Sequence, residues 1–108
     1  MKSEVEYSNQ DLRLASLAKA LGHPARLRIL TFLYQEESCF CGDLVKEIGL
    51  AQATVSQHLK ELKTQGIIKG QITGPAVCYC INPEIWEEMK VLFQAFLDHS
   101  LPLKANCC

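Results

Sequence analysis

Two amphipathic segments joined at a glycine, within residues 43–68, place the strongest constraint on how this chain folds. In both segments apolar side chains recur at intervals of three and four residues, which places them on one face of a helix. These side chains are Leu44, Val45 and Ile48 before Gly49, and Val55, Leu59 and Leu62 after it. Two helices joined by a tight turn that contains glycine are typical of a helix-turn-helix, whose second helix enters the major groove of DNA.

The polar face of the second segment suits contact with DNA. It carries Thr54, Ser56, Gln57, Lys60, Glu61 and Lys63. A glutamine side chain can form paired hydrogen bonds with adenine, whereas hydroxyl and ammonium groups can bind phosphates. The same pattern also describes an ordinary helical hairpin with a solvated polar face, so periodicity alone leaves both interpretations open.

Net charge does not exclude nucleic acid, because the basic side chains are concentrated in the middle of the chain. The formal net charge is −1 over 108 residues, but residues 12–82 carry eight basic and five acidic side chains, a balance of +3, and each end carries −2. A chain of this length forms one domain, taken here as 1–108 with flexible ends at 1–10 and 100–108. It has no apolar run long enough to cross a membrane and begins with a polar, acidic stretch, so we expect a cytoplasmic protein.

Two helices are expected before the helix-turn-helix. Residues 11–21 carry one apolar stripe and are followed by Gly22, a plausible helix end. Pro24 suits the first turn of the next helix, which is apolar around its girth and is therefore expected to be buried. His23, between the two, is interpreted as a structural or capping residue rather than as a ligand.

A β-hairpin and one more helix are expected after it. Residues 67–73 and 77–81 read as strands around the turn signal Gly74-Pro75. The helix that opens at Pro83 carries a broad apolar stripe, which pairing with a second copy of the chain would bury together with the first helix. The expected fold is mainly α with a small β-hairpin: a winged helix-turn-helix that dimerises through its first and last helices.

Three motifs in order carry a family resemblance: LGHPARLRIL at 21–30, DLVKEIGLAQATVSQHLKELKTQGII at 43–68, and VCYCINP at 77–83. Together they resemble the ArsR/SmtB family of winged-helix repressors, over about residues 12–83. The resemblance implies a homodimeric repressor that binds double-stranded operator DNA at an imperfect inverted repeat and leaves it when an inducer binds. Ala53 stands where many relatives carry serine, and His58 is expected to face a phosphate or to pack between helices. The residues expected to contact DNA are Gln52, Ala53, Thr54, Ser56, Gln57, His58, Lys60, Lys63, Thr73 and Gly74.

Six cysteines in three close pairs suggest a thiolate site, since thiols in the cytosol stay reduced and paired thiolates are good ligands for soft ions. Cys39 and Cys41 lie just before the helix-turn-helix, where the partial positive charge of a helix N-terminus would favour thiolates. Many arsenic-sensing relatives carry Cys-x-Cys directly before Asp-Leu or Glu-Leu; here Gly42 intervenes, which would rotate the thiols if the helix already ran there.

A third thiolate is expected from the tail, where Cys107 and Cys108 follow the last helix. Trivalent arsenic and antimony favour three thiolates, and two from Cys39 and Cys41 with one from the tail would suffice. The wing pair Cys78 and Cys80 is expected to point outward, away from the helices, either as a second soft-ion site or as two small residues on a half-exposed strand. A four-thiolate zinc site from both Cys-x-Cys pairs is an open alternative, although structural zinc sites usually space paired cysteines more widely.

The resulting hypothesis is a repressor released by As(III) or Sb(III), with no cofactor required for folding and other soft metal ions possible as inducers. Three alternatives remain open: a persulfide or redox sensor of the same fold, a cadmium or lead sensor, and a protein-interaction winged helix without a DNA role. The zinc-sensing branch places its Asp and His ligands on the last helix at a spacing that the adjacent Asp98 and His99 do not match. No catalytic set and no phosphate-binding loop is recognisable, so an enzyme is not expected.

Overall fold

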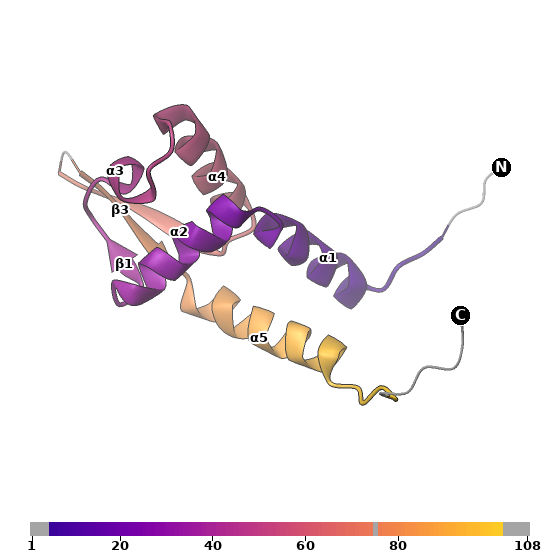
Figure 1. The fold of residues 1–108 in the computed structure, drawn as a ribbon. Coiled ribbons are helices and arrows are strands. Elements are labelled where there is room, and N and C mark those ends of the chain that lie inside the picture. The colour runs from indigo at the N-terminus through magenta and orange to yellow at the C-terminus, as the bar shows by residue number, and fades with distance from the viewer. Residues whose placement is uncertain (1–4, 75, 103–108) are drawn as a thin grey trace.

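The computed structural model describes residues 5–74 and 76–102, and within them the chain folds into five helices and three strands (Figure 1). In chain order they are α1 (Asn9–Leu21), α2 (Pro24–Gln35), β1 (Cys39–Phe40), α3 (Leu44–Ile48), α4 (Gln52–Thr64), β2 (Ile68–Thr73), β3 (Ala76–Ile81) and α5 (Pro83–Leu97). No helix in these two ranges is both long and apolar enough to pass through a bilayer. The mainly helical winged helix-turn-helix predicted from the sequence is confirmed.

The helix-turn-helix consists of α3 and α4, with the boundaries that the glycine break predicts. The carboxylate of Asp43 accepts a hydrogen bond from the backbone N–H of Lys46 at 3.2 Å and so caps the start of α3. Gly49, with a φ of 83°, ends α3 in the left-handed conformation that glycine adopts at least cost. The N-cap of α4 is Ala51, which offers no side-chain hydrogen bond.

The junction between α1 and α2 confirms the capping role expected for His23. The Nδ1 atom of His23 accepts a hydrogen bond from the backbone N–H of Ala25 at 3.0 Å, and Pro24 occupies the first turn of α2. Ser8 caps α1 in the same way, by accepting from the backbone N–H of Asp11.

The core lies between α2, α4 and the sheet, but α2 is not buried around its whole girth as predicted. On the inner side of α2, Ile29 and Leu33 are fully buried, whereas Leu27 is half exposed and Tyr34 is 64% exposed. The side of α2 that carries Leu27 and Tyr34 faces away from the core of the single chain, which is why apolar periodicity alone overestimated its burial. The largest fully buried side chains of the core are Leu17, Ile29, Leu33, Ile48, Val55, Leu62, Ile67 and Ile68.

The wing is a three-stranded antiparallel sheet rather than the two-stranded hairpin that the sequence predicted. The strand order is β1-β3-β2, so that β3 lies in the middle. β1 is only two residues long and pairs Cys39 with Cys80 and Phe40 with Tyr79. A backbone hydrogen bond of 2.7 Å from the N–H of Ile81 to the carbonyl of Ser38 extends the pairing.

α1 and α5 lie side by side and extend away from the helix-turn-helix and the sheet (Figure 1). An ion pair joins them: Nε and an Nη atom of Arg13 contact the two carboxylate oxygens of Glu88 at 2.9 and 3.0 Å. Hydrogen bonding to Arg13 is the main reason why the pKa of Glu88 is lowered. Because both partners are partly exposed, this pair orients the helices more than it stabilises the fold.

Candidate nucleic-acid interface and cysteine cluster

α4 separates its buried and exposed residues along opposite faces. Val55, Leu59 and Leu62 are buried against the core. The other face is open to solvent and presents Gln52, Ala53, Thr54, Ser56, Gln57, Lys60 and Lys63. Every residue of α4 predicted to contact DNA therefore lies on the exposed face, except His58. The Nε2 amide of Gln57 donates a hydrogen bond to the Glu61 carboxylate at 3.4 Å. The cationic side chains of this face are those of Lys60 and Lys63.

The C-terminal half of α4 adjoins the wing. A shallow hollow of about 340 Å³ lies between them and is lined by Ser56, Leu59, Lys60, Lys63, Thr64 and Tyr79. The Nζ atom of Lys63 lies above Gly70 of β2, where a Cβ atom would be in ordinary contact with it at 3.5 Å. The two predicted wing residues lie at the hairpin end, Thr73 as the last residue of β2 and Gly74 in the turn, with a φ of 61°.

His58 is on the core side of α4 and packs between helices. It is only 7% exposed, and its Nδ1 atom accepts a hydrogen bond of 3.1 Å from Nε of Arg26. The rings of His58 and His23 are 4.3 Å apart between centroids. Arg26 also donates to the carbonyls of Lys19 and Ala20, at 3.4 and 3.2 Å, so one guanidinium links α4 to the ends of α1 and α2. Of the two roles expected for His58, this position favours helix packing.

The burial of His58 makes fold stability depend on pH. Its pKa is lowered chiefly by burial and also by the charges of His23 and Arg26. The unfolded chain therefore takes up a proton, near pH 6.5, before the folded chain does. Stability is fully present above that pH and falls as the pH drops below it, by up to about 1.4 kcal/mol per pH unit. Denaturant unfolding at pH 7.5 and 5.5 measures this loss, which the substitution His58→Asn should reduce because an amide oxygen can replace Nδ1 as acceptor.

An exposed histidine provides the matched control for this measurement. His99 follows α5 and is exposed, so the substitution His99→Asn should leave the pH dependence of unfolding unchanged. An unfolding free energy of the His58→Asn protein that falls with acid as steeply as that of the wild type would contradict the assignment.

Cys39 and Cys41 lie just before the helix-turn-helix, as expected, and they are in and just after a strand rather than on a helix. Cys39 belongs to β1, and Cys41 is two residues before the Asp43 cap of α3. The one-residue shift before Asp43 therefore does not rotate the thiols around a helix. Phe40, between them, turns the other way and packs edge-on against Phe32, with ring centroids 4.8 Å apart. Phe40 is thus the anchor that directs Cys39 and Cys41 to the outer face of the sheet.

All four of these cysteines meet on that outer face. β3 places Cys80 opposite Cys39, and Cys41 and Cys78 are joined next to them, so the structure contains two disulfides where the sequence analysis expected free thiols: Cys39–Cys80 and Cys41–Cys78. The Cα atoms of each pair are 4.0 Å apart. We refer to Cys39, Cys41, Cys78 and Cys80 as the four-cysteine cluster. Cys107 and Cys108 lie outside the described residues.

The wing cysteines differ from the prediction in exposure. Both were expected on an open outer side, but Cys78 is only 7% exposed because β1 and Cys41 cover it. Val77, on the other face of β3, is 41% exposed. In the disulfide form, the described residues hold no group of three or more His, Cys, Asp or Glu side chains able to bind a metal ion.

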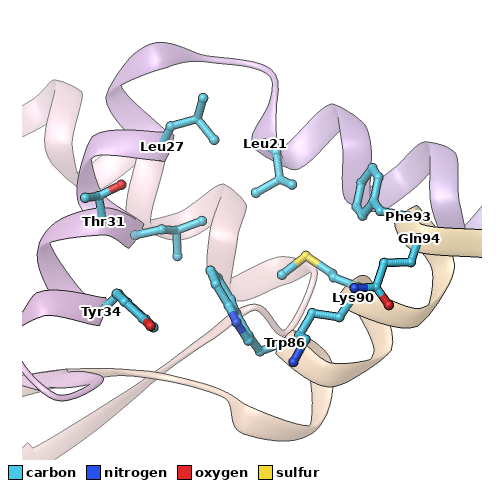
Figure 2. A pocket seen from close by; sticks show the side chains of 10 residues that line it. Leu21, Leu27, Thr31, Tyr34, Trp86, Lys90, Phe93 and Gln94 are labelled. Atoms are coloured by element: carbon cyan, nitrogen blue, oxygen red, sulfur yellow. The ribbon is translucent and has the colours of Figure 1, made fainter. Parts of the chain in front are cut away.

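A separate apolar cavity of about 420 Å³ opens between α2 and α5 (Figure 2). Figure 2 shows Leu27 and Tyr34 of α2 on one side, and Trp86 and Phe93 of α5 on the other. The rings of Tyr34 and Trp86 are nearly parallel, with centroids 6.4 Å apart. The cavity continues the exposed apolar surface of α5 and contains none of the cysteines.

An exposed polar helix beside a small β wing, both built on a helical core, defines the class of winged helix-turn-helix proteins. Residues 23–69 match the model of the "Bacterial regulatory protein, arsR family". The chain is 36% identical over 70 residues to the HTH-type transcriptional regulator YgaV of Escherichia coli, which covers 65% of this chain and 71% of the relative. It is 31% identical over 99 residues to a transcriptional repressor SmtB homolog of Synechocystis, covering 92% of this chain and 72% of the relative. The chain belongs to the ArsR/SmtB family of transcriptional repressors, and it is not an enzyme.

A solved structure gives the same fold independently. The homodimeric winged helix-turn-helix DNA-binding domain Mb0332 of Mycobacterium bovis superposes with a TM-score of 0.64, at 24% identity, over 100% of both chains.

Proposed function

We propose that the protein is a homodimeric repressor that binds an imperfect inverted repeat in double-stranded DNA and leaves it when As(III) or Sb(III) binds its cysteines. The observation that carries the proposal is the position of Cys39 and Cys41, which precede α3 directly and lie against β3 of the wing. An ion bound there would contact residues next to α3 and next to the wing, and these two elements lie on either side of the recognition helix α4. We expect the protein to act in the cytoplasm.

Dimerisation is supported by apolar side chains that a single chain leaves exposed. α5 exposes Val91, Phe96 and Leu97, and α1 exposes Leu12. Figure 1 places α1 and α5 together, on the side of the molecule away from α4. Two copies joined through these helices would carry two recognition helices. To bind an inverted repeat, these two helices must lie about one DNA turn apart, roughly 34 Å. The homodimeric state of the Mycobacterium bovis domain supports the same arrangement.

The four-cysteine cluster, once reduced, offers more thiolates than As(III) or Sb(III) needs. Cys39 and Cys41 supply two of the three ligands in the proposal. The third comes from Cys78 or Cys80, because β3 holds both directly against the first pair. The tail cysteines Cys107 and Cys108 remain the alternative third ligand, and the experiment below separates the two sources.

Release follows from a change in how the recognition helix is presented. Thiolates that share one ion lie farther apart than the two sulfurs of a disulfide, so binding the ion changes the position of Cys41 relative to β3 of the wing. Cys41 is connected through Gly42 and Asp43 to α3, so this movement shifts α3 and α4 relative to the wing. A coupling free energy of about 1 to 3 kcal/mol weakens DNA binding roughly 5- to 150-fold.

Arsenite titration of the reduced protein on DNA tests the proposal. The probe is a fluorescent duplex that the protein selects from a random-sequence pool, and the signal is anisotropy. We expect arsenite to release the wild-type protein and not the Cys39→Ser/Cys41→Ser protein, whose DNA affinity stays unchanged because neither residue is on the exposed face of α4. Release of this double variant at the wild-type arsenite concentration would refute the proposal.

Two further double variants identify the third ligand. The Cys78→Ser/Cys80→Ser protein should lose release, and the Cys107→Ser/Cys108→Ser protein should keep it. The opposite result would assign the third thiolate to the tail. Parallel titrations with cadmium and lead compare As(III) with other soft ions on the same site.

A further inference from the structure

We propose that the four-cysteine cluster is a reversible oxidation site, at which low-molecular-weight disulfides convert the repressor into a form that cannot respond to its inducer. This inference rests on the proposed function, because it assigns a second chemistry to the same thiols. In the oxidised form both cross-strand disulfides are closed, as in the structure, and no thiolate of the cluster remains for As(III).

Backbone pairing prepares the cysteines for this reaction. Strand register sets Cys39 opposite Cys80, and the alternation of side chains places Cys41 and Cys78 on the same face. Phe40 and Tyr79 are paired between them and point to the inner side, where both pack against the core. The sulfur atoms are therefore brought together by the fold itself, so that closing the disulfides requires no rearrangement of β1 or β3.

The two pairs differ in access. Cys39 and Cys80 line a hollow of about 510 Å³ that lies between the sheet and the start of α5, together with Lys69 of β2 and Glu87 of α5. Lys69 is directly opposite Cys80 in the β2–β3 pairing, and positive charge beside a cysteine favours its reactive thiolate. In the second pair Cys78 is buried, so that only Cys41 is open to a small disulfide. A small disulfide therefore reaches Cys39 and Cys80 first, and Cys41 and Cys78 close afterwards.

The chemistry balances with oxidised glutathione as the oxidant. The thiolate of Cys39 or Cys80 attacks one sulfur of glutathione disulfide, which forms a mixed disulfide and releases one glutathione thiolate. The neighbouring protein thiolate then attacks the mixed disulfide, closes the protein disulfide and releases the second glutathione. Each protein disulfide thus transfers two electrons to one oxidant molecule, and the whole site consumes two. Excess dithiol reverses both steps.

Oxidation should leave DNA binding in place while it removes the inducer site. The disulfides attach β1 to β3 on the face of the sheet away from α4, in the same winged arrangement that presents the recognition helix. The predicted oxidised state is therefore a repressor that still binds its operator and is insensitive to arsenite. A cell under thiol oxidation would keep the regulated genes repressed even with the metalloid present.

Peptide mapping tests the modification itself. Full-length reduced protein is treated with oxidised glutathione, alkylated, denatured and digested with trypsin and chymotrypsin. Chymotrypsin cuts after Phe40 and Tyr79, so it separates the two cysteines of each Cys-x-Cys pair. We expect linked peptides that join Cys39 to Cys80 and Cys41 to Cys78, with the first pair appearing earlier. Linkage only to Cys107 or Cys108, or free thiols at all four positions, would overturn the inference.

Arsenite release, measured on the same oxidised sample, tests the consequence. We expect DNA affinity like that of the reduced protein, loss of the roughly 5- to 150-fold weakening by arsenite, and its recovery after reduction. In the Cys39→Ser/Cys80→Ser protein, which lacks a proposed inducer ligand, only peptide mapping is informative: it should still find Cys41 linked to Cys78, which shows that the inner pair closes without the outer one. Release of fully oxidised protein by arsenite would refute the inference, and so would loss of DNA binding on oxidation. Failure of arsenite on reduced protein would instead refute the proposed inducer and leave the mapped disulfides standing.

Discussion

Replacing both lysines on the exposed face of the recognition helix, in the Lys60→Ala/Lys63→Ala protein, should nearly abolish operator binding at physiological salt. The two ammonium groups border the hollow between α4 and the wing, where a phosphate backbone would lie. Each phosphate contact changes the slope of log affinity against log salt by about 0.9, which makes one contact worth roughly fivefold at 0.15 M salt. Four such contacts are lost in a homodimer, so we expect a loss of about 10²- to 10³-fold and a shallower slope.

Anisotropy titrations at several salt concentrations measure both effects. Lys90→Ala is the matched control, because Lys90 is an exposed lysine on α5, remote from α4, with Glu87 as an ion-pair partner at 3.5 Å. It removes one positive charge from the chain, against two in the double variant, and should change neither affinity nor slope, provided that the protein still sediments as a dimer. An unchanged salt slope in the Lys60→Ala/Lys63→Ala protein would show that α4 does not face the phosphates.

Placing a carboxylate on the exposed apolar surface of α5, by Phe96→Glu, should yield monomers that bind the operator poorly. Phe96 is 64% exposed in the single chain, and Val91 and Leu97 on the same helix are exposed as well. An unpaired charge buried in an interface costs about 3 to 5 kcal/mol, enough to separate most dimers of modest affinity. A monomer contacts only one half-site, and losing the second, tethered contact weakens binding by roughly 10²- to 10⁴-fold.

Sedimentation and anisotropy report these two consequences separately. The conservative variant Phe96→Leu keeps the surface apolar and should remain dimeric with nearly normal affinity. Circular dichroism establishes that the Phe96→Glu chain is still folded, as expected for a side chain outside the core. A Phe96→Glu protein that stays dimeric at micromolar concentration would locate the interface elsewhere, for example over the cavity between α2 and α5.

The helical part of the fold could be predicted from the sequence because its signals are local. The three- and four-residue intervals of Leu44, Ile48, Val55, Leu59 and Leu62, with glycine at 49, specify two short helices and the turn between them. His23 and Pro24 likewise mark a helix start through their own chemistry. What such signals do not fix is which side of an apolar helix is covered, and the exposed Leu27 and Tyr34 of α2 show this.

The third strand could not be predicted with the same rules, because β1 is two residues long and depends on a partner about 40 positions away. A signal was nevertheless present, because Cys39 and Cys41 flank Phe40 just as Cys78 and Cys80 flank Tyr79. In a strand this pattern places the cysteines on one face and the aromatic residue on the other, and its occurrence in both segments is what two paired strands would show. Proximity to the Asp43 cap linked the first pair to the helix instead, and contact between the two pairs was considered only as the four-thiolate zinc alternative.

The exposed residues of α4 were predictable for a different reason. The exposed positions of α4 follow directly from its apolar stripe, so the side chains opposite Val55 and Leu62 had to face outward. His58 was the ambiguous position, since it borders the stripe. Its place against Arg26 and His23 depends on how α4 crosses α1 and α2, which helical periodicity does not specify.

Side chains alternate along β3, and this has a consequence for how such repressors can diversify. Tyr79 and Ile81 turn toward α4 and the core, whereas the cysteines occupy the opposite surface. In the proposed mechanism, substitutions on that surface can alter the chemical signal to which the protein responds without changing a residue on the exposed face of α4. Substitutions along the outer side of α4 can alter the preferred operator without touching a sulfur. The two specificities can therefore evolve, or be engineered, independently within 108 residues.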